Sequence, residues 1–105
     1  MLRVDKHRIT WRHEMYSDNS HKLDGEPRPE FRAVTTCDIH YEKEDNVRTY
    51  CGVGVAGCSW DDNFCRDTGR KISLKRALRD AGISSSLRRK IWEEYRVSMT
   101  DKPRW

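Results

Sequence analysis

The chain is poor in apolar sequence. Only 35% of its 105 residues are hydrophobic, and its mean hydropathy is −1.00. No run approaches the roughly 20 apolar residues of a membrane-spanning helix, and the N-terminal segment MLRVDKHRITW lacks the apolar centre of a secretory signal. These absences predict a cytoplasmic protein without membrane contact. Because so polar a chain has a thin core, we also expect a homo-oligomer, which buries further surface.

Catalytic signatures are missing as well. The sequence has no P-loop, no G-x-S-x-G and no H-E-x-x-H. The histidines are scattered over the predicted strands and a loop: His7, His13, His21 and His40. Cys37 and His40 do not suit a nucleophile and its base, because residues three apart on a strand point to opposite faces. We therefore predict a protein that is not an enzyme and needs no cofactor.

The four cysteines lack the paired C-x-x-C spacing of a zinc ribbon or finger. Without a secretory signal, free thiols are expected in place of disulfides. Two interpretations of these cysteines stay open: they are incidental buried thiols, or they are metal ligands. The residues are Cys37, Cys51, Cys58 and Cys65. We predict no metal site. A tight hairpin would place Cys37 opposite Cys51 as a thiol pair on the core side.

Alternation of apolar and polar residues predicts an antiparallel sheet within residues 2–58. Its strands are expected at 8–16 (with a start as early as Leu2), 31–43 and 47–58. Residues 17–29 are rich in Ser, Asp, Asn and Pro, which predicts a long loop.

Glycines alternate with valines in the third predicted strand. We expect Val53 and Val55 on the core face, together with Cys51. Gly52 and Gly54 would then lie on the other face and leave it flat. A flat face allows another backbone, a ring or a subunit to approach closely, and a bulge is the alternative.

Two helices should follow the sheet. Ser59 or Asp61 is a suitable cap for the first helix, Gly82 a suitable stop, and Ser84 a suitable start for the second. The fold class expected is α+β, with an N-terminal antiparallel sheet of three to four strands followed by two C-terminal helices packed on it. One domain spans residues 1–105, made of the sheet (2–58) with its loop (17–29), a two-helix layer (59–99) and a tail (100–105).

The junction between sheet and first helix combines two kinds of binding group. Arginine forks bind phosphates bidentately, and aromatic faces stack on bases. Gly69 inside the helix indicates close packing or a bend beside Arg70. In the alternative interpretation the aromatic residues belong to the core and the arginines are solvated. The predicted ligand-binding residues are Trp60 and Phe64 for stacking, Asn63 for a polar edge, Arg70, Arg76 and Arg79 for phosphates, and Arg28 from the loop.

Residues 52–64, GVGVAGCSWDDNF, and residues 69–78, GRKISLKRAL, resemble a motif of small phage and prophage proteins. In that motif a strand of small residues leads to D-x-F, then to G-R and R-A-L on the next helix. The overall layout is similar to the Thoeris anti-defence sponges of phages. The resemblance implies an oligomeric counter-defence protein of the host cytoplasm. Such a protein sequesters a cyclic nucleotide signal, of the cyclic ADP-ribose type or a cyclic oligonucleotide, without cleaving it.

Two other functions stay open. The net charge is +4, from 21 basic and 17 acidic residues. The basic helices are one surface for a nucleic acid, although a charge this modest disfavours strong groove binding. An inhibitor of a host defence nuclease complex, similar to anti-CRISPR proteins, is the other alternative, and it requires a host protein as partner.

Overall fold

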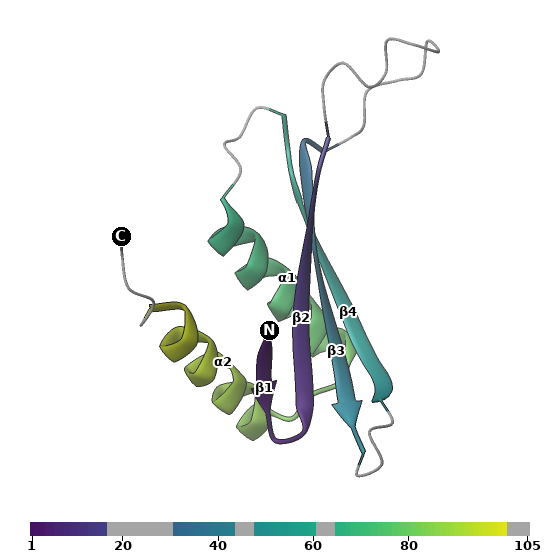
Figure 1. Ribbon diagram of the computed structural model, residues 1–105, viewed down its shortest axis with the longest axis vertical. Helices are drawn as coiled ribbons and strands as arrows, with labels where there is room; N and C mark the ends of the chain where they lie inside the picture. The colour runs from purple at the N-terminus through teal and green to yellow at the C-terminus, as the bar shows by residue number, and fades with distance from the viewer. Residues whose placement is uncertain (17–30, 44–47, 61–64, 101–105) are drawn as a thin grey trace.

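Four strands and two helices make up the computed structural model, which describes residues 1–16, 31–43, 48–60 and 65–100. The strands form one antiparallel sheet in the order β1-β2-β3-β4, and both helices lie on the same face of it (Figure 1). This confirms the predicted α+β fold with its C-terminal helical layer. The elements are β1 (Leu2–Val4), β2 (His7–Met15), β3 (Ala33–Glu42), β4 (Arg48–Cys58), α1 (Arg66–Asp80) and α2 (Ser85–Thr100).

The N-terminal hairpin differs from the single strand expected to begin as early as Leu2. Val4 pairs with His7, so Asp5 and Lys6 alone form the turn, with φ angles of 45° and 66°. Two left-handed residues give the turn the twist that a two-residue hairpin needs. The Lys90 ammonium group on α2 lies 3.1 Å from the Asp5 carboxylate and so links this turn to the helical layer.

The faces of β4 are the reverse of those predicted. Gly54 pairs with Cys37, so the predicted pairing of Cys37 with Cys51 is wrong. A register irregularity between Ile39 and His40 shifts the pairing, and a shift of one residue moves side chains to the opposite face. Gly54 is buried, whereas Val55 is 46% exposed. The valines therefore lie away from the helices.

The glycines of β4 let the backbone of α1 approach the sheet. A Cβ atom at Gly52 would lie 2.7 Å from the amide nitrogen of Ala81. A Cβ atom at Gly54 would overlap the carbonyl oxygen of Ser73 and the amide nitrogen of Ala77. The predicted close approach of another backbone is therefore confirmed, and that backbone is α1.

Side chains of α1 also reach the outer edge of β4. The Val53 amide donates a hydrogen bond to Asp80 Oδ2 at 3.0 Å, and Arg76 Nη1 donates one to the Val55 carbonyl oxygen at 2.6 Å. Unpaired edge groups are a template for aggregation, and charged side chains that occupy them reduce this tendency. Arg76 and Asp80 thus protect the edge of the sheet.

The helix boundaries confirm two predicted signals and overturn one. α1 begins at Arg66 with Cys65 as the N-cap residue, whereas Ser59 directly follows β4, so Ser59 is not the cap. At the end of β4 the Arg32 amide donates a hydrogen bond to the Cys58 carbonyl oxygen at 2.8 Å; Asp61 lies outside the described residues. Gly82 follows α1 with φ 65°, and the Ser84 hydroxyl accepts the Leu87 amide at 3.4 Å.

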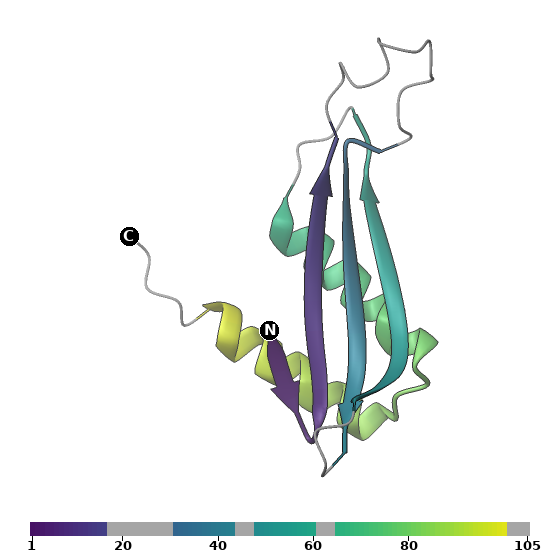
Figure 2. The same ribbon diagram turned by 45° about the vertical axis from the view of Figure 1, so that its right-hand side comes forward.

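The core fills the space between the sheet and the two helices. Figure 2 shows α1 running along β3 and β4, with α2 crossing near β1. The side of α2 that meets the core carries Ile91 and Tyr95, which are 0% and 1% exposed. On α1, Ile72 lies away from the core and is 39% exposed; Phe64 lies outside the described residues. The buried stripe of α1 is Ser73, Leu74, Ala77 and Leu78.

Candidate functional site

A polar cluster lies where the first half of α1 crosses β2 and β3. His13 on β2 is paired directly with Thr35 on β3, and His13 Nδ1 is 2.8 Å from Thr35 Oγ1. Thr35 is fully buried. A Cβ atom at Gly69 would lie 2.5 Å from that oxygen, so glycine allows α1 to pass over the hydrogen-bonded pair. The close packing predicted at Gly69 is confirmed.

Arg70 continues the buried stripe of α1 with a charged group. It lies three and four residues before Ser73 and Leu74, on the same side of the helix. Trp11 Nε1 donates a hydrogen bond to the Arg70 carbonyl oxygen at 3.3 Å, which holds this part of α1 on β2. The Nε atom of Arg70 is buried and has no hydrogen-bond partner among the described residues. A buried donor without an acceptor is costly.

Two positive charges lie near His13. Burial lowers the pKa of the His13 imidazole, and the guanidinium charges of Arg66 and Arg70 lower the pKa further. Arg66 precedes Arg70 by four residues, so both project from one side of α1. Within the described part of the chain neither guanidinium forms an ion pair. The positive charge of Arg70 also acts on the Asp67 carboxylate, whose pKa it helps to lower, so Asp67 offsets part of the positive charge of the cluster.

The nearest acid on α1 is occupied by other partners. Asp67 Oδ1 accepts a hydrogen bond from the Tyr95 hydroxyl at 2.8 Å, and Asp67 Oδ2 lies 2.9 Å from the Lys71 ammonium group. The hydrogen bonds from Lys71 and Tyr95 lower the pKa of Asp67. The Tyr95 ring packs edge-on against Trp11, with centroids 5.8 Å apart. This contact, with the Asp67 bond, fixes α2 beside the cluster.

The structure separates the residues predicted to form one site. Arg70 belongs to the cluster, whereas Arg76 bonds to the edge of β4. Arg79 is exposed and lies nine residues after Arg70, on the opposite side of the helix. Trp60 is partly buried and lies four residues beyond Ala56, the partner of Thr35, which is up to about 13 Å of chain. Asn63, Phe64 and Arg28 lie outside the described residues.

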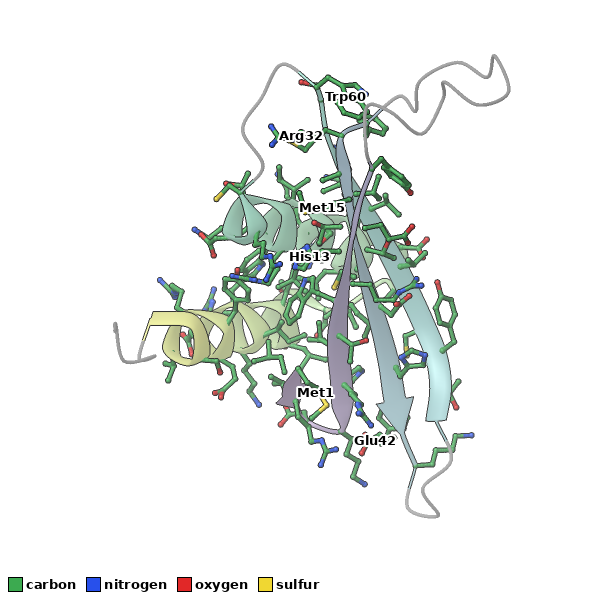
Figure 3. The ribbon with its side chains drawn as sticks, turned by 45° about the horizontal axis from the view of Figure 1, so that its top comes forward. Met1, His13, Met15, Arg32, Glu42 and Trp60 are labelled. Atoms are coloured by element: carbon green, nitrogen blue, oxygen red, sulfur yellow. The ribbon has the colours of Figure 1, made fainter. Side chains whose placement is uncertain are left out.

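Figure 3 shows the resulting arrangement, with His13 toward the C-terminal end of β2 and Trp60 beyond the end of β4. The sequence patterns did not point to His13, Thr35, Arg66 or Tyr95 as site residues. One signal was present. Extending the apolar stripe of α1 back by one turn from Ser73 and Leu74 leads to Arg70, and a second turn leads to Arg66.

The cysteines offer no reactive group inside the cluster. All four cysteines lie outside disulfide bonds. Burial raises the pKa of Cys37 to about 12, which keeps that thiol protonated at neutral pH. Cys65 is exposed at the start of α1, and hydrogen bonding to Thr68 lowers its pKa. Among the described residues no group of three His, Cys, Asp or Glu side chains is placed to hold a metal ion.

The chain was compared with known proteins. No protein-family model matches it, and the comparisons with curated proteins and with solved structures find no match either. Within the described ranges, no helix combines the length and apolar character needed to cross a membrane.

Proposed function

We propose that the chain binds and sequesters a small phosphorylated ligand of the nucleotide class. The observation that carries this proposal is the convergence of Arg66 and Arg70 on His13, with Arg70 Nε buried and lacking an acceptor. Like charges held together raise the energy of the free protein, and a bound anion lowers it. Guanidinium groups bind phosphate oxygens in bidentate geometry, so a phosphate fits this cluster.

Binding without turnover is favoured by the surrounding groups. The His13 imidazole is engaged by Thr35, and the Asp67 carboxylate is engaged by Tyr95 and Lys71. Catalysis by a nucleophile requires an activated group with a base in reach, and the buried Cys37 thiol, with a pKa of about 12, is not activated.

The resemblance to phage anti-defence sponges supplies the ligand class within this proposal. A cyclic nucleotide carries phosphates for Arg66 and Arg70 and a base that stacks on an aromatic ring. Trp60 at the end of β4 is the aromatic side chain proposed for that contact. The biological role proposed is phage counter-defence, in which the protein removes a cyclic nucleotide immune signal without cleaving it.

The test combines thermal stabilisation with recovery of the ligand. The purified chain is incubated with cyclic ADP-ribose isomers and cyclic di- and trinucleotides, then heated, and the released ligand is identified by mass spectrometry. At about 100 times Kd a ligand stabilises by about 2.7 kcal/mol, which corresponds to a rise in Tm of about 10 °C or more. We expect this rise with one ligand, recovered intact.

Variants locate the binding to the cluster. Arg70→Gln should abolish the rise in Tm, and Arg79→Gln, on the opposite side of the same helix, is the matched control that should keep it. Hydrolysed ligand, or no rise with any nucleotide, would contradict the proposal. Binding that instead weakens steeply with salt and extends to unrelated nucleic acids would favour the nucleic-acid alternative.

A further inference from the structure

The Thr35 hydroxyl gives His13 a partner that suits both protonation states. A hydroxyl donates a hydrogen bond to a neutral ring nitrogen, and it accepts one from a protonated ring nitrogen. The 2.8 Å bond between His13 and Thr35 can therefore persist when the imidazole gains a proton. A carboxylate in the same place would instead hold the ring protonated at all times.

The charges around His13 favour the neutral ring in the free protein. From α1, Arg66 and Arg70 act on it with positive charge, and this repulsion, after burial, lowers its pKa. From β3 the adjacent group is the uncharged Thr35 hydroxyl, and on β2 the neighbouring side chains of the same face are Trp11 and Met15, which carry no charge. Also on α1, the Asp67 carboxylate interacts with the charge of Arg70, and from α2 the Tyr95 phenol donates a hydrogen bond to Asp67.

We propose that His13 takes up a proton when an anion fills the cluster, so that the site selects a group with two negative charges, a diphosphate or a terminal phosphate, over a single phosphodiester. This inference rests on the proposed function of the same site. With an anion between the guanidiniums, the nearest charge to the ring becomes negative and favours the imidazolium. The three cations then match a doubly charged group better than a singly charged one.

The size of the effect follows from linkage between binding and protonation. An opposite charge within about 4–6 Å raises a pKa by about 1–3 units, and each unit corresponds to a tenfold change in affinity. The affinity should therefore rise about tenfold as the pH falls from about 8 to about 6, because the complex holds a proton that the free protein lacks.

ADP-ribose is a suitable probe because both of its phosphates are esterified. Its two negative charges persist from about pH 8 to about pH 6, whereas a terminal phosphate titrates near pH 6, so a change of affinity belongs to the protein. Isothermal titration calorimetry in buffers of different ionisation enthalpy counts the protons taken up on binding. Cyclic AMP, with a single phosphodiester, is the matched ligand with one charge.

The wild-type chain should take up a fraction of a proton with ADP-ribose at about pH 7 and bind cyclic AMP at least about tenfold more weakly. His13→Gln keeps a polar partner for Thr35, and it should remove both the proton uptake and the pH dependence. If His13→Gln does not fold, NMR titration of the wild-type chain measures the pKa rise of the His13 ring on binding directly. The His13 signal is assigned by elimination, with Gln variants of the other histidines.

The outcomes separate this inference from the proposed function. Tight ADP-ribose binding with no proton uptake and a flat pH profile would overturn the role of His13 and leave the binding function intact. Equal affinity for cyclic AMP would overturn the charge selection. If inorganic pyrophosphate, ADP-ribose and cyclic nucleotides all fail to bind, the proposed function and the inference fail together.

Discussion

Gly54→Ala should destabilise the protein more than the addition of a single methyl group suggests. Gly54 lies within β4 opposite Cys37 and faces α1, where the added Cβ atom would overlap backbone atoms of Ser73 and Ala77. Backbone atoms cannot rotate away as a side chain can. The helix as a whole must therefore move, and Ser73 and Ala77 lie on its fully buried side.

The magnitude follows from opposing effects. Alanine is intrinsically better than glycine in a strand by about 0.5–1 kcal/mol. Overpacking a close-packed core costs about 1–3 kcal/mol and occasionally more, and displacement of α1 also loosens Leu74 and Leu78, which are 0% and 1% exposed. We expect a net loss of about 1–3 kcal/mol, against a total stability of about 5–15 kcal/mol for a domain.

Urea unfolding followed by circular dichroism measures this loss. Gly82→Ala is one control, because Gly82 has φ 65° with nothing near its Cβ position, so only backbone strain of about 1–2 kcal/mol is expected. Val55→Ala is a second control on the open face, with an expected change within about 0.5 kcal/mol. A Gly54→Ala variant as stable as the wild-type protein would refute the close approach of α1 to β4.

Three further predictions concern α1 and the cluster. Gly69→Ala should destabilise the protein because the added Cβ atom would lie 2.5 Å from Thr35 Oγ1. Thr35→Ala removes that oxygen, so a double-mutant cycle of the two changes, measured by urea unfolding, should show a coupling of about 1 kcal/mol or more. Additive effects of the two changes would contradict the contact. Arg76→Ala with Asp80→Ala frees the edge of β4, so sedimentation should show more self-association than in the wild-type chain; unchanged sedimentation would argue against edge protection. The lowered pKa of His13 means that the unfolded chain binds this proton first. The neutral His13 ring therefore contributes to the free energy of unfolding above the pKa that this histidine has in the unfolded chain. The contribution is lost as the pH falls through the lower pKa of His13 in the folded state. His13→Gln should flatten that part of the profile in ligand-free urea titrations, and an unchanged slope would exclude His13 as its source.

The alternation of residues predicted the sheet and the helical layer, because period 2 and punctuation residues are local signals. The turn at Asp5 and Lys6 was missed for a local reason too. Both residues adopt positive φ, and neither is the glycine that usually marks such a turn. Tertiary contacts such as the link from Asp5 to Lys90 support the turn, and these are not visible in a short stretch of sequence.

The faces of β4 could not be assigned from hydrophobicity. Both alternating sets consist of small or apolar residues, and the valines suggested the core face. The glycines face inward because the backbone of α1 lies where their side chains would be. A criterion based on apolar area favours Val53 and Val55, whereas the packing of a helix backbone favours Gly52 and Gly54, and only the three-dimensional arrangement decides between them.

The composition predicted arginines for phosphate binding but did not show which of them share a side of the helix. That question depends on the rotation of α1, which the buried stripe from Ser73 to Leu78 determines. With this rotation Arg70 lies over β2, and Arg76 lies over the edge of β4. A helix rotated so that Ile72 faced the core would turn both arginines to other sides of the molecule.

The same glycines that hold α1 on the sheet also prepare the cluster. Gly69 over Thr35 and Gly54 under Ser73 bring the helix so close that the Arg70 Nε atom is buried before any ligand arrives. Tyr95, 1% exposed, donates a 2.8 Å hydrogen bond to the neighbouring Asp67 and so fixes a carboxylate on which the charge of Arg70 acts. A charged group positioned by the core loses little freedom on binding, so Arg70 in this setting should contribute more affinity than an exposed arginine does. A net charge of only +4 is therefore compatible with tight binding at one site.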